Sequence, residues 1–380
     1  MRSTDSNGAF LVWSASPGSE AAVEAAAAYA QIAEALSRLG LRIVQERIFG
    51  SLSVEAAIEA ARQEALGSRG ILADGPRSYI EGRPVWGEGF AGVLMRAAAG
   101  HEVRTIREDG IARGHIWQTD GARYLILQDV QAPSSCPCGD DTPPGQVRCA
   151  IERADRILRM NGAGYRDTVR TWFYVSNILG WYDRFNESRN AEYGEFGLMP
   201  STGGKHALPA STGIGAGLAG GIACSLDLLA VTPVVGAVGP VVSRIANPRQ
   251  QEAFRYGSAF SRCTIVRGPR ENLIEVSGTA AIDEHGRSLW PGDVRGQARC
   301  TLEKTASLLE RIGASLHDIT AASIFLKHGD DAEAVREVLA EMGMERLPAV
   351  WVEADVCREE LQFEIDAEAV VPRHSIDNAH

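Results

Sequence analysis

The stretch RCTLEKTASLLERIGASLHDITAASIFL, from Arg299 to Leu326, has a counterpart in RCAIERADRILRMNGAGYRDTVRTWFYV, from Arg148 to Val175. The two align without gaps at an offset of 151 residues. Identical pairs in this register are Gly145 and Gly296, Gln146 and Gln297, Arg148 and Arg299, Cys149 and Cys300, Glu152 and Glu303, Leu158 and Leu309, Gly162 and Gly313, Ala163 and Ala314, and Asp167 and Asp318. Apolar residues recur at helical spacing, a glycine follows, and an apolar run comes next. The pattern predicts a helix, its C-terminal cap and a strand, present twice in one chain.

The likeness resumes downstream of this unit. LPASTGIGAGLAGGIACSLDLLAV, which starts at Leu208, aligns with LPAVWVEADVCREELQFEIDAEAV, which starts at Leu347, at an offset of 139 residues. Upstream of each helix is a short run typical of a strand, RYLILQDV at Arg123 and NLIEVSGTA at Asn272. Each module is therefore expected to contain a strand, a helix, a strand, a second helix and a last strand.

A weaker third copy is expected near the N-terminus. AQIAEALSRLGLRIVQERIFGS contains a helical run, Gly40 and a following strand, SVEAAIEAARQEAL supplies a second helix, and YIEGRPVWGEGFAGVLM a last strand. The predicted organisation is an N-terminal α/β segment (1–101), a first clear module (102–236) and a C-terminal module (250–372). The N-terminal segment is then either a degenerate third module or an extension.

Composition narrows the class of protein. The chain has 380 residues, of which 45% are hydrophobic and 23% charged, as in an ordinary globular protein. Its formal net charge of −11 argues against a nucleic-acid-binding face. The N-terminus lacks the apolar core of a signal peptide, and no run is apolar enough to span a membrane, so a cytoplasmic protein with reduced cysteines is expected.

Two motifs raise the question of a metal or a nucleotide. Cys136, Cys138 and Cys149 could suggest zinc, but no second pair or nearby histidine completes four ligands. GIGAGLAGG, from Gly213, lies in a segment expected to hold a strand, without the strand, turn and helix of a dinucleotide site. We therefore predict neither a metal nor a cofactor.

The order of segments, with GDVRGQARCTLEKTASLLERIGASLHDI and CREELQFEIDAEAV, resembles the RidA (YjgF) superfamily. A narrower resemblance, to its chorismatase-like branch, is carried by VRTWFYV, LPASTGIGAGLAGGI, NPRQQEAFRYGSAFSR and VCREELQFEI. The likeness is good over residues 255–371 and weaker over 102–235. It implies an α+β fold of tandem RidA-like (chorismate-mutase-like) modules, each a mixed sheet covered on one face by helices.

The resemblance also implies a function. Chorismatases remove the enolpyruvyl group of chorismate, so we expect a cofactor-independent enzyme that acts on a small anionic enol ether and releases pyruvate. Single-module members of the superfamily form homotrimers with sites between subunits. A homotrimer, or a pseudo-trimer within one chain, is therefore expected.

Glu364 is the predicted general acid. It falls where the superfamily holds a glutamate, and at the offset of 139 its counterpart in the other module is Ser225. Burial at a module interface would keep its carboxyl protonated near neutral pH. Asp366 and Glu368 share its strand face, which for these two is expected to be solvated.

Cations and a phenol are candidates for binding the substrate. Arg262, in FSR, matches an arginine of the chorismatase motif and is expected to hold a carboxylate, since a planar guanidinium suits that geometry. Arg170, in VRTW, is the second candidate. Either could instead be an ordinary surface arginine. Tyr256 could donate a hydrogen bond to the substrate or be an interface tyrosine.

Two cysteines and two departures from the family pattern bear on the product. The resemblance implies that Cys357, seven residues before Glu364, is a catalytic residue and favours a hydroxybenzoate over a diene acid; it could instead be a buried structural cysteine. Cys263 stands where the family has Gly or Ala, and could reshape the pocket or be a buried core residue. Phe173 replaces an asparagine, and Ser323 a lysine, which suggests a smaller or less charged substrate.

Two alternatives remain open. A RidA-type imine or enamine hydrolase needs an arginine after the LPA turn, where this chain has Val350. A ligand-binding protein without catalytic activity would keep Glu364 and Arg262 without using them for chemistry.

Overall fold

The computed structural model describes residues 2–3, 8–73, 75–99, 103–119, 121–133, 140–200, 206–234, 236 and 239–373. The cysteine pair Cys136 and Cys138 lies outside these ranges. Cys149 is disulfide-bonded, whereas the sequence analysis expected reduced cysteines. In the part of the chain that is described, no helix combines the length and the apolar character needed to cross a membrane.

The repeated stretch forms the predicted helix and strand in both copies. These are α3 (Pro143–Met160) with β10 (Thr168–Val175), and α5 (Val294–Glu310) with β16 (Ile319–Leu326). Gly162 and Gly313 both have a φ of 72°, a left-handed conformation that glycine adopts without strain. Asp167 and Asp318 each accept a hydrogen bond at 2.8 Å from the backbone N–H three residues earlier. The identities therefore mark the points where the chain turns from helix to strand.

Gln146 and Gln297 also have the same structural role in the two copies. The side-chain oxygen of Gln146 accepts a hydrogen bond from the backbone N–H of Ala223 at 2.8 Å, and that of Gln297 from Gln362 at 2.7 Å. Both bonds fix the chain just before the last strand of the module. The conserved helix thus positions the strand that carries Glu364.

The closing segment of each module holds two strands where one was predicted. In the module over 102–236, from here on the second module, these are β11 (Ala210–Gly215) and β12 (Cys224–Pro233). In the module over 250–372, the third module, they are β17 (Ala349–Glu353) and β18 (Phe363–Pro372). The first strand of each pair lies parallel to β10 or β16, and the second lies antiparallel on the other side. The first strands are short and apolar, so the sequence did not separate them from the second.

The N-terminal segment has the same order of elements. It contains β1 (Arg2–Ser3), β2 (Gly8–Ser14), α1 (Ala21–Leu39), β3 (Leu41–Gly50), α2 (Glu55–Ser68), β4 (Ser78–Glu81) and β6 (Phe90–Ala99). Its sheet runs β1-β2-β6-β3-β4. The short β5 (Arg83–Pro84) leaves this sheet and pairs with β17.

The other two sheets follow the same plan. The second runs β11-β10-β12-β9-β8-β7 and the third β13-β14-β15-β18-β16-β17-β5. Their remaining elements are β7 (Arg104–Glu108), β8 (Ile111–Thr119), β9 (Ala122–Gln131), α4 (Tyr182–Glu195), β13 (Val241–Ile245), β14 (Cys263–Arg267), β15 (Glu271–Ala280) and α6 (Ala332–Glu341). The predicted α+β class is confirmed, and the shared order supports our proposal of three modules over 1–101, 102–236 and 250–372.

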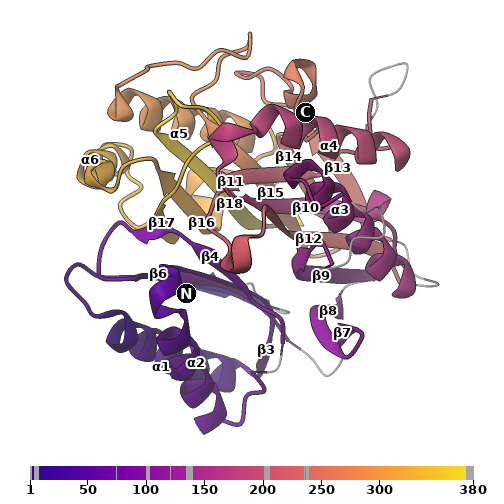
Figure 1. Cartoon of the computed structure of the whole chain (residues 1–380), viewed down its shortest axis with the longest axis vertical. Coiled ribbons are helices and arrows are strands. Elements are labelled where there is room, and N and C mark those ends of the chain that lie inside the picture. Colours follow the sequence, from indigo (N-terminus) through magenta and orange to yellow (C-terminus); the bar gives the residue numbers. More distant parts are fainter. Residues whose placement is uncertain are drawn as a thin grey trace.

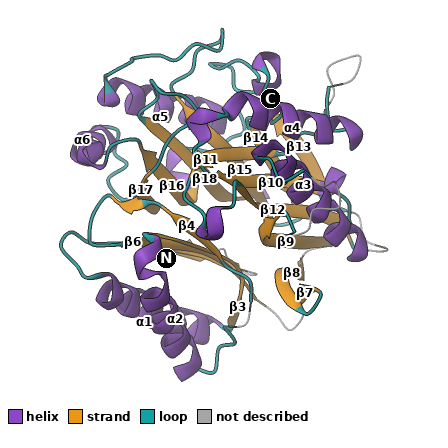
Figure 2. Cartoon of the chain, in the orientation of Figure 1, coloured by secondary structure: helices purple, strands orange, loops and turns teal. Residues whose placement is uncertain are grey.

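The three sheets close into a ring. Strand β4 lies beside β9, β11 beside β15, and β17 beside β2, so each module contacts both of the others. The helices cover the outer faces and the strands face inward (Figures 1 and 2). Each sheet has an apolar core under its own helices, and a fourth core is shared by all three sheets. This arrangement supports the pseudo-trimer within one chain as our proposal.

Six charged side chains meet inside the ring. They are three arginines, Arg47, Arg96 and Arg170, and three carboxyl residues, Glu275, Asp366 and Glu368. Glu368 accepts hydrogen bonds from Arg47 and Arg96, both at 2.6 Å, and Asp366 pairs with Arg170 at 3.0 Å. The prediction that Asp366 and Glu368 face solvent is wrong, since each is 2% exposed. Carboxyl and apolar residues alternate along β18 as predicted. The face that carries the carboxyl groups was expected to be solvated, but the other two sheets cover it.

Candidate active site

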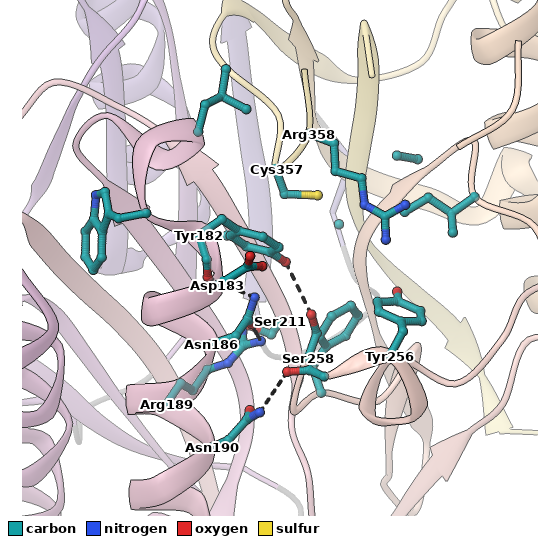
Figure 3. A pocket seen from close by; sticks show the side chains of 18 of the residues that line it. Tyr182, Asp183, Asn186, Arg189, Asn190, Ser211, Tyr256, Ser258, Cys357 and Arg358 are labelled. Carbon is teal, nitrogen blue, oxygen red and sulfur yellow. Dashed lines mark hydrogen bonds between the residues drawn. The ribbon is translucent and has the colours of Figure 1, made fainter. Parts of the chain in front are cut away.

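A cavity of about 710 Å³ lies between the second and third modules (Figure 3). This volume is in the range of small-molecule sites. Its walls come from α4, β11, the connection that precedes β14, the end of β15 and the chain leading into β18. Residues used below that line it are Tyr182, Arg189, Tyr256, Phe260, Arg262, Gly278, Cys357 and Glu364.

Glu364 lies at the cavity on the second residue of β18. It pairs with Phe325 of β16, as Ser225 pairs with Tyr174 of β10, so the sheet registers confirm the counterpart expected from the sequence. Its side chain is buried, and its carboxyl forms no hydrogen bond to another described residue. Burial, and then the neighbouring Asp366, raises the pKa of Glu364 to about 8, although Arg170 and Arg262 oppose the rise. The carboxyl is therefore mostly protonated at neutral pH.

Gly278 makes room for this carboxyl. A Cβ at Gly278 would lie 2.2 Å from Oε1 of Glu364. Asp129 occupies the same place in the second module, where it accepts a hydrogen bond from Ser225 at 2.9 Å. At one interface a glycine leaves space for an acid, and at the sister interface an aspartate fills that space.

We expect Gly278→Ala to lower activity on the substrate by roughly 100-fold, because displacing a catalytic group by about 1 Å can cost that much. The atom it meets is the far end of a flexible side chain, so Glu364 should move and the fold should persist. Steady-state rates and thermal unfolding would measure both effects. Gly67→Ala, which meets nothing within 4 Å, is the control. Full activity in Gly278→Ala would show that the position of Glu364 is unimportant.

Arg262 and Tyr256 form one wall of the cavity. Arg262 is 2% exposed, and its Nε donates to the carbonyl of Gln251 at 3.0 Å. Its Nη2 donates to the same carbonyl and to the hydroxyl of Tyr256, the latter at 2.6 Å. Nη1 has no acceptor among the described residues, and Arg262 forms no ion pair with any of them. Because Tyr256 accepts this bond, its own O–H remains free to donate to a ligand.

Cys357 lines the cavity beside Tyr182, the first residue of α4. Burial, and then the neighbouring Glu364, raises the pKa of Cys357 to about 12, and a hydrogen bond with Tyr182 only partly offsets this. Figure 3 shows the thiol near the Tyr182 ring. The sulfur is therefore a neutral thiol at physiological pH and not a thiolate nucleophile.

The structure places Arg170 and Cys263 away from the cavity walls. Arg170 is fully buried in the central charge cluster, where Asp366 and the hydroxyl of Thr212 accept its hydrogen bonds. Cys263 is fully buried and its thiol donates to the backbone carbonyl of Thr264. Arg170 still acts on Glu364 through its charge, whereas Cys263 belongs to the apolar core of the third module.

The two departures from the family pattern also lie off the cavity. Phe173 is fully buried and packs edge-on against Phe185 at 5.2 Å between ring centroids. Ser323 is fully buried, and its backbone N–H donates to Asp366 at 3.2 Å. Neither residue lines the cavity, so their identities do not support the expectation of a smaller substrate.

Sequence reasoning missed Arg189. This residue of α4 lines the cavity, is 2% exposed, and donates through Nη2 to Asn186 at 2.6 Å. No described carboxyl group pairs with it. The sequence of α4 is mostly polar, so it gave no sign that this arginine is buried. Among the described residues, no group of three His, Cys, Asp or Glu side chains is placed to hold a metal ion.

Comparison of the sequence with known proteins finds matches over parts of the chain. Residues 252–371 match the endoribonuclease L-PSP family. The chain is 30% identical over 226 residues to a chorismatase of Streptomyces hygroscopicus, which covers 53% of this chain and 61% of that protein. It is 29% identical over 258 residues to a 3-hydroxybenzoate synthase of the same organism, covering 60% and 72%. The match to the chorismatase thus spans less than two thirds of that relative's length.

The fold also has a solved counterpart. A crystal structure of a chorismatase superposes with a TM-score of 0.64 at 20% identity, covering 96% of this chain and all of that one. At this identity the likeness concerns the fold alone. The resemblance found in the sequence is confirmed: residues 252–371 match the endoribonuclease L-PSP (RidA/YjgF) family, and the chain is similar to chorismatases.

Proposed function

We propose that this chain is a chorismatase-like enzyme that removes the enolpyruvyl group of chorismate, or of a related enol-ether carboxylate, and releases pyruvate. One observation carries the proposal. A carboxyl group that is mostly protonated at neutral pH, Glu364, lines a cavity whose wall also holds the guanidinium of Arg262 with a free donor. An acid beside a carboxylate anchor is what protonation of an enol ether requires.

The proposed chemistry begins with proton transfer. Nη1 of Arg262 binds the carboxylate of the enolpyruvyl group, and Glu364 gives its proton to the methylene carbon. The π electrons of the double bond form the new C–H bond, and an oxocarbenium ion remains. The resulting Glu364 carboxylate is stabilised by the positive charges of Arg170 and Arg262.

Cleavage of the ether then releases pyruvate. With water as the nucleophile, water adds to the oxocarbenium carbon, gives up a proton to the Glu364 carboxylate, and the hemiketal collapses to pyruvate and a ring diol. Without net uptake of water, the bond between the ring carbon and the ether oxygen breaks with its electron pair on the oxygen, which becomes the ketone of pyruvate. The ring then loses a proton to the Glu364 carboxylate and becomes a hydroxybenzoate. We propose the hydroxybenzoate outcome, with Cys357 as a neutral thiol close to the acid and Tyr256 as a hydrogen-bond donor to the substrate oxygen. The 3-hydroxybenzoate synthase among the relatives supports this choice.

The pH dependence should report the acid directly. Because Glu364 must be protonated and its pKa is about 8, kcat/KM should be level at neutral pH and fall as the pH rises through about 8. Three charged groups act on this carboxyl: Asp366, which raises the pKa, and Arg170 and Arg262, which lower it. Cys357→Ala should keep the same alkaline limb, since the thiol titrates near 12. A rate that increases with pH across this range would exclude Glu364 as the acid.

A coupled assay for pyruvate tests the function itself. Folded protein incubated with chorismate and lactate dehydrogenase should oxidise NADH, and chromatography should show a hydroxybenzoate. No pyruvate would remove the proposal. Binding of chorismate without turnover, unchanged in Glu364→Gln, would favour the non-catalytic alternative. The imine hydrolase alternative requires an arginine at the position of Val350. This chain has a fully buried valine there instead.

A further inference from the structure

Arg189 has no counter-charge among the residues that the structure describes. It is 2% exposed, and among the described residues its polar contact is the Nη2 bond to Asn186. Its Nε is buried without a hydrogen-bond partner. Burying a guanidinium without a carboxylate is costly unless another group supplies the negative charge. Of the other buried arginines, Arg47, Arg62, Arg96 and Arg170 have such a partner, and Arg262, like Arg189, has none among the described residues.

Aromatic rings hold this guanidinium in place. Its central carbon lies 5.1 Å from the ring centroid of Phe185, 5.7 Å from that of Phe260 and 5.9 Å from that of Phe173. Cation–π contacts orient an arginine but leave its net charge in place. Phe173, one of the departures from the family pattern, therefore contributes to the position of Arg189 without lining the cavity.

Arg189 and Arg262 both pack against the ring of Phe260. The Arg262 guanidinium lies 5.2 Å from the centroid of Phe260, on which Arg189 also packs. Arg262 acts electrostatically on Glu364, whereas Arg189 acts on Tyr182, Tyr193 and Cys224. Figure 3 shows Arg189 on the α4 side beside Asn186 and Asn190, away from Cys357. Of these two cations, Arg262 is the one that acts on the acid.

We propose that Arg189 is a second anion-binding residue. It binds a carboxylate on the ring of the substrate, which becomes the second product once pyruvate has been released. The assignment rests on the proposed function, in which Arg262 holds the carboxylate next to the reacting carbon. It makes the cavity selective for ligands with two carboxylates. Nη1 of Arg189, which has no acceptor among the described residues, is the donor that faces the second carboxylate.

Binding measurements with an unreactive pair of ligands test this assignment. The probes are 3-(1-carboxyethoxy)benzoate, which has both carboxylates and no double bond to protonate, and its ring methyl ester, which keeps only the side-chain carboxylate. Calorimetry should show that Arg189→Met weakens binding of the diacid by roughly 10- to 100-fold, as for loss of a charge-assisted hydrogen bond. Binding of the ester should change by less than about threefold.

Two further variants make the result specific. Arg189→Lys keeps the charge and should bind the diacid with intermediate affinity, which preserves the test if the methionine variant does not fold. Arg69→Met removes an exposed cation that does not line the cavity and should change neither affinity by more than about threefold. Equal binding of diacid by Arg189→Met and the unaltered protein would overturn the proposal, as would equal losses for diacid and ester. Because no turnover is measured, failure of the pyruvate assay would leave this result standing.

Discussion

Replacing Glu364 by glutamine should lower the rate of pyruvate release by roughly 10²- to 10⁴-fold, the usual contribution of a general acid. Glutamine has nearly the same shape but no proton acidic enough to transfer to carbon. The native carboxyl is mostly neutral at pH 7, so the substitution removes little charge and the fold should be as stable as before. Single-turnover rates with chorismate and thermal unfolding would measure the two quantities.

The control for this variant is Glu359→Gln. Glu359 also lines the cavity, but its side chain is 78% exposed and pairs with Lys327 at the surface. Loss of that exposed pair should leave the rate within about twofold. If Glu364→Gln released pyruvate at an undiminished rate, another group would have to supply the proton, and the proposed chemistry would be wrong.

Glu368→Gln should lower the free energy of unfolding by about 3–5 kcal/mol, because it leaves buried Arg47 without a carboxylate partner and buried Arg96 with Glu275 alone. Glu368 accepts bonds at 2.6 Å from Arg47 and from Arg96, and all three side chains are buried between the sheets. Burial raises the pKa of Glu368, but Arg96 and Arg47 more than offset this and hold it below its usual value. Denaturant unfolding followed by tryptophan fluorescence would give the difference.

Glu341→Gln provides the comparison on the surface. Glu341 pairs with Arg295 at 3.0 Å and with Arg299, but its side chain is 45% exposed. Solvent screens such pairs, so the loss should stay below about 1 kcal/mol. Equal losses in the two variants would mean that the central cluster does not hold the three sheets together.

Much of the fold was readable from the repeat. The identical glycines, glutamines and aspartates occur where the backbone turns or where a side chain fixes a strand, so their spacing predicted the helix and strand of each module. The counterpart of Glu364 in the second module followed from the same alignment, because the closing strands keep their register. Local patterns were sufficient for features that depend on neighbours in sequence.

Features that depend on the assembled ring were not readable in this way. Asp366 and Glu368 alternate along β18 as solvated residues do, and only the other two sheets reveal that this face is closed. Arg170 was chosen as a ligand for substrate because a cation in a motif looks available, yet its carboxylate partner lies 196 residues away in sequence. Arg189 was missed because the three phenylalanines around it come from separate segments.

Joining three modules in one chain has a consequence for stoichiometry. In a homotrimer of identical subunits a substitution appears at all three interfaces, whereas here each interface has its own residue at the position of the acid. The residue at the position of Glu364 is Ser225 in the second module and Gly92 in the N-terminal one. Gly92 takes this position because it pairs with Phe49 and Ser14. Glu364 pairs in the same way with Phe325 and Ala280. Titration with a substrate analogue should therefore saturate at one equivalent per chain, along a simple hyperbola.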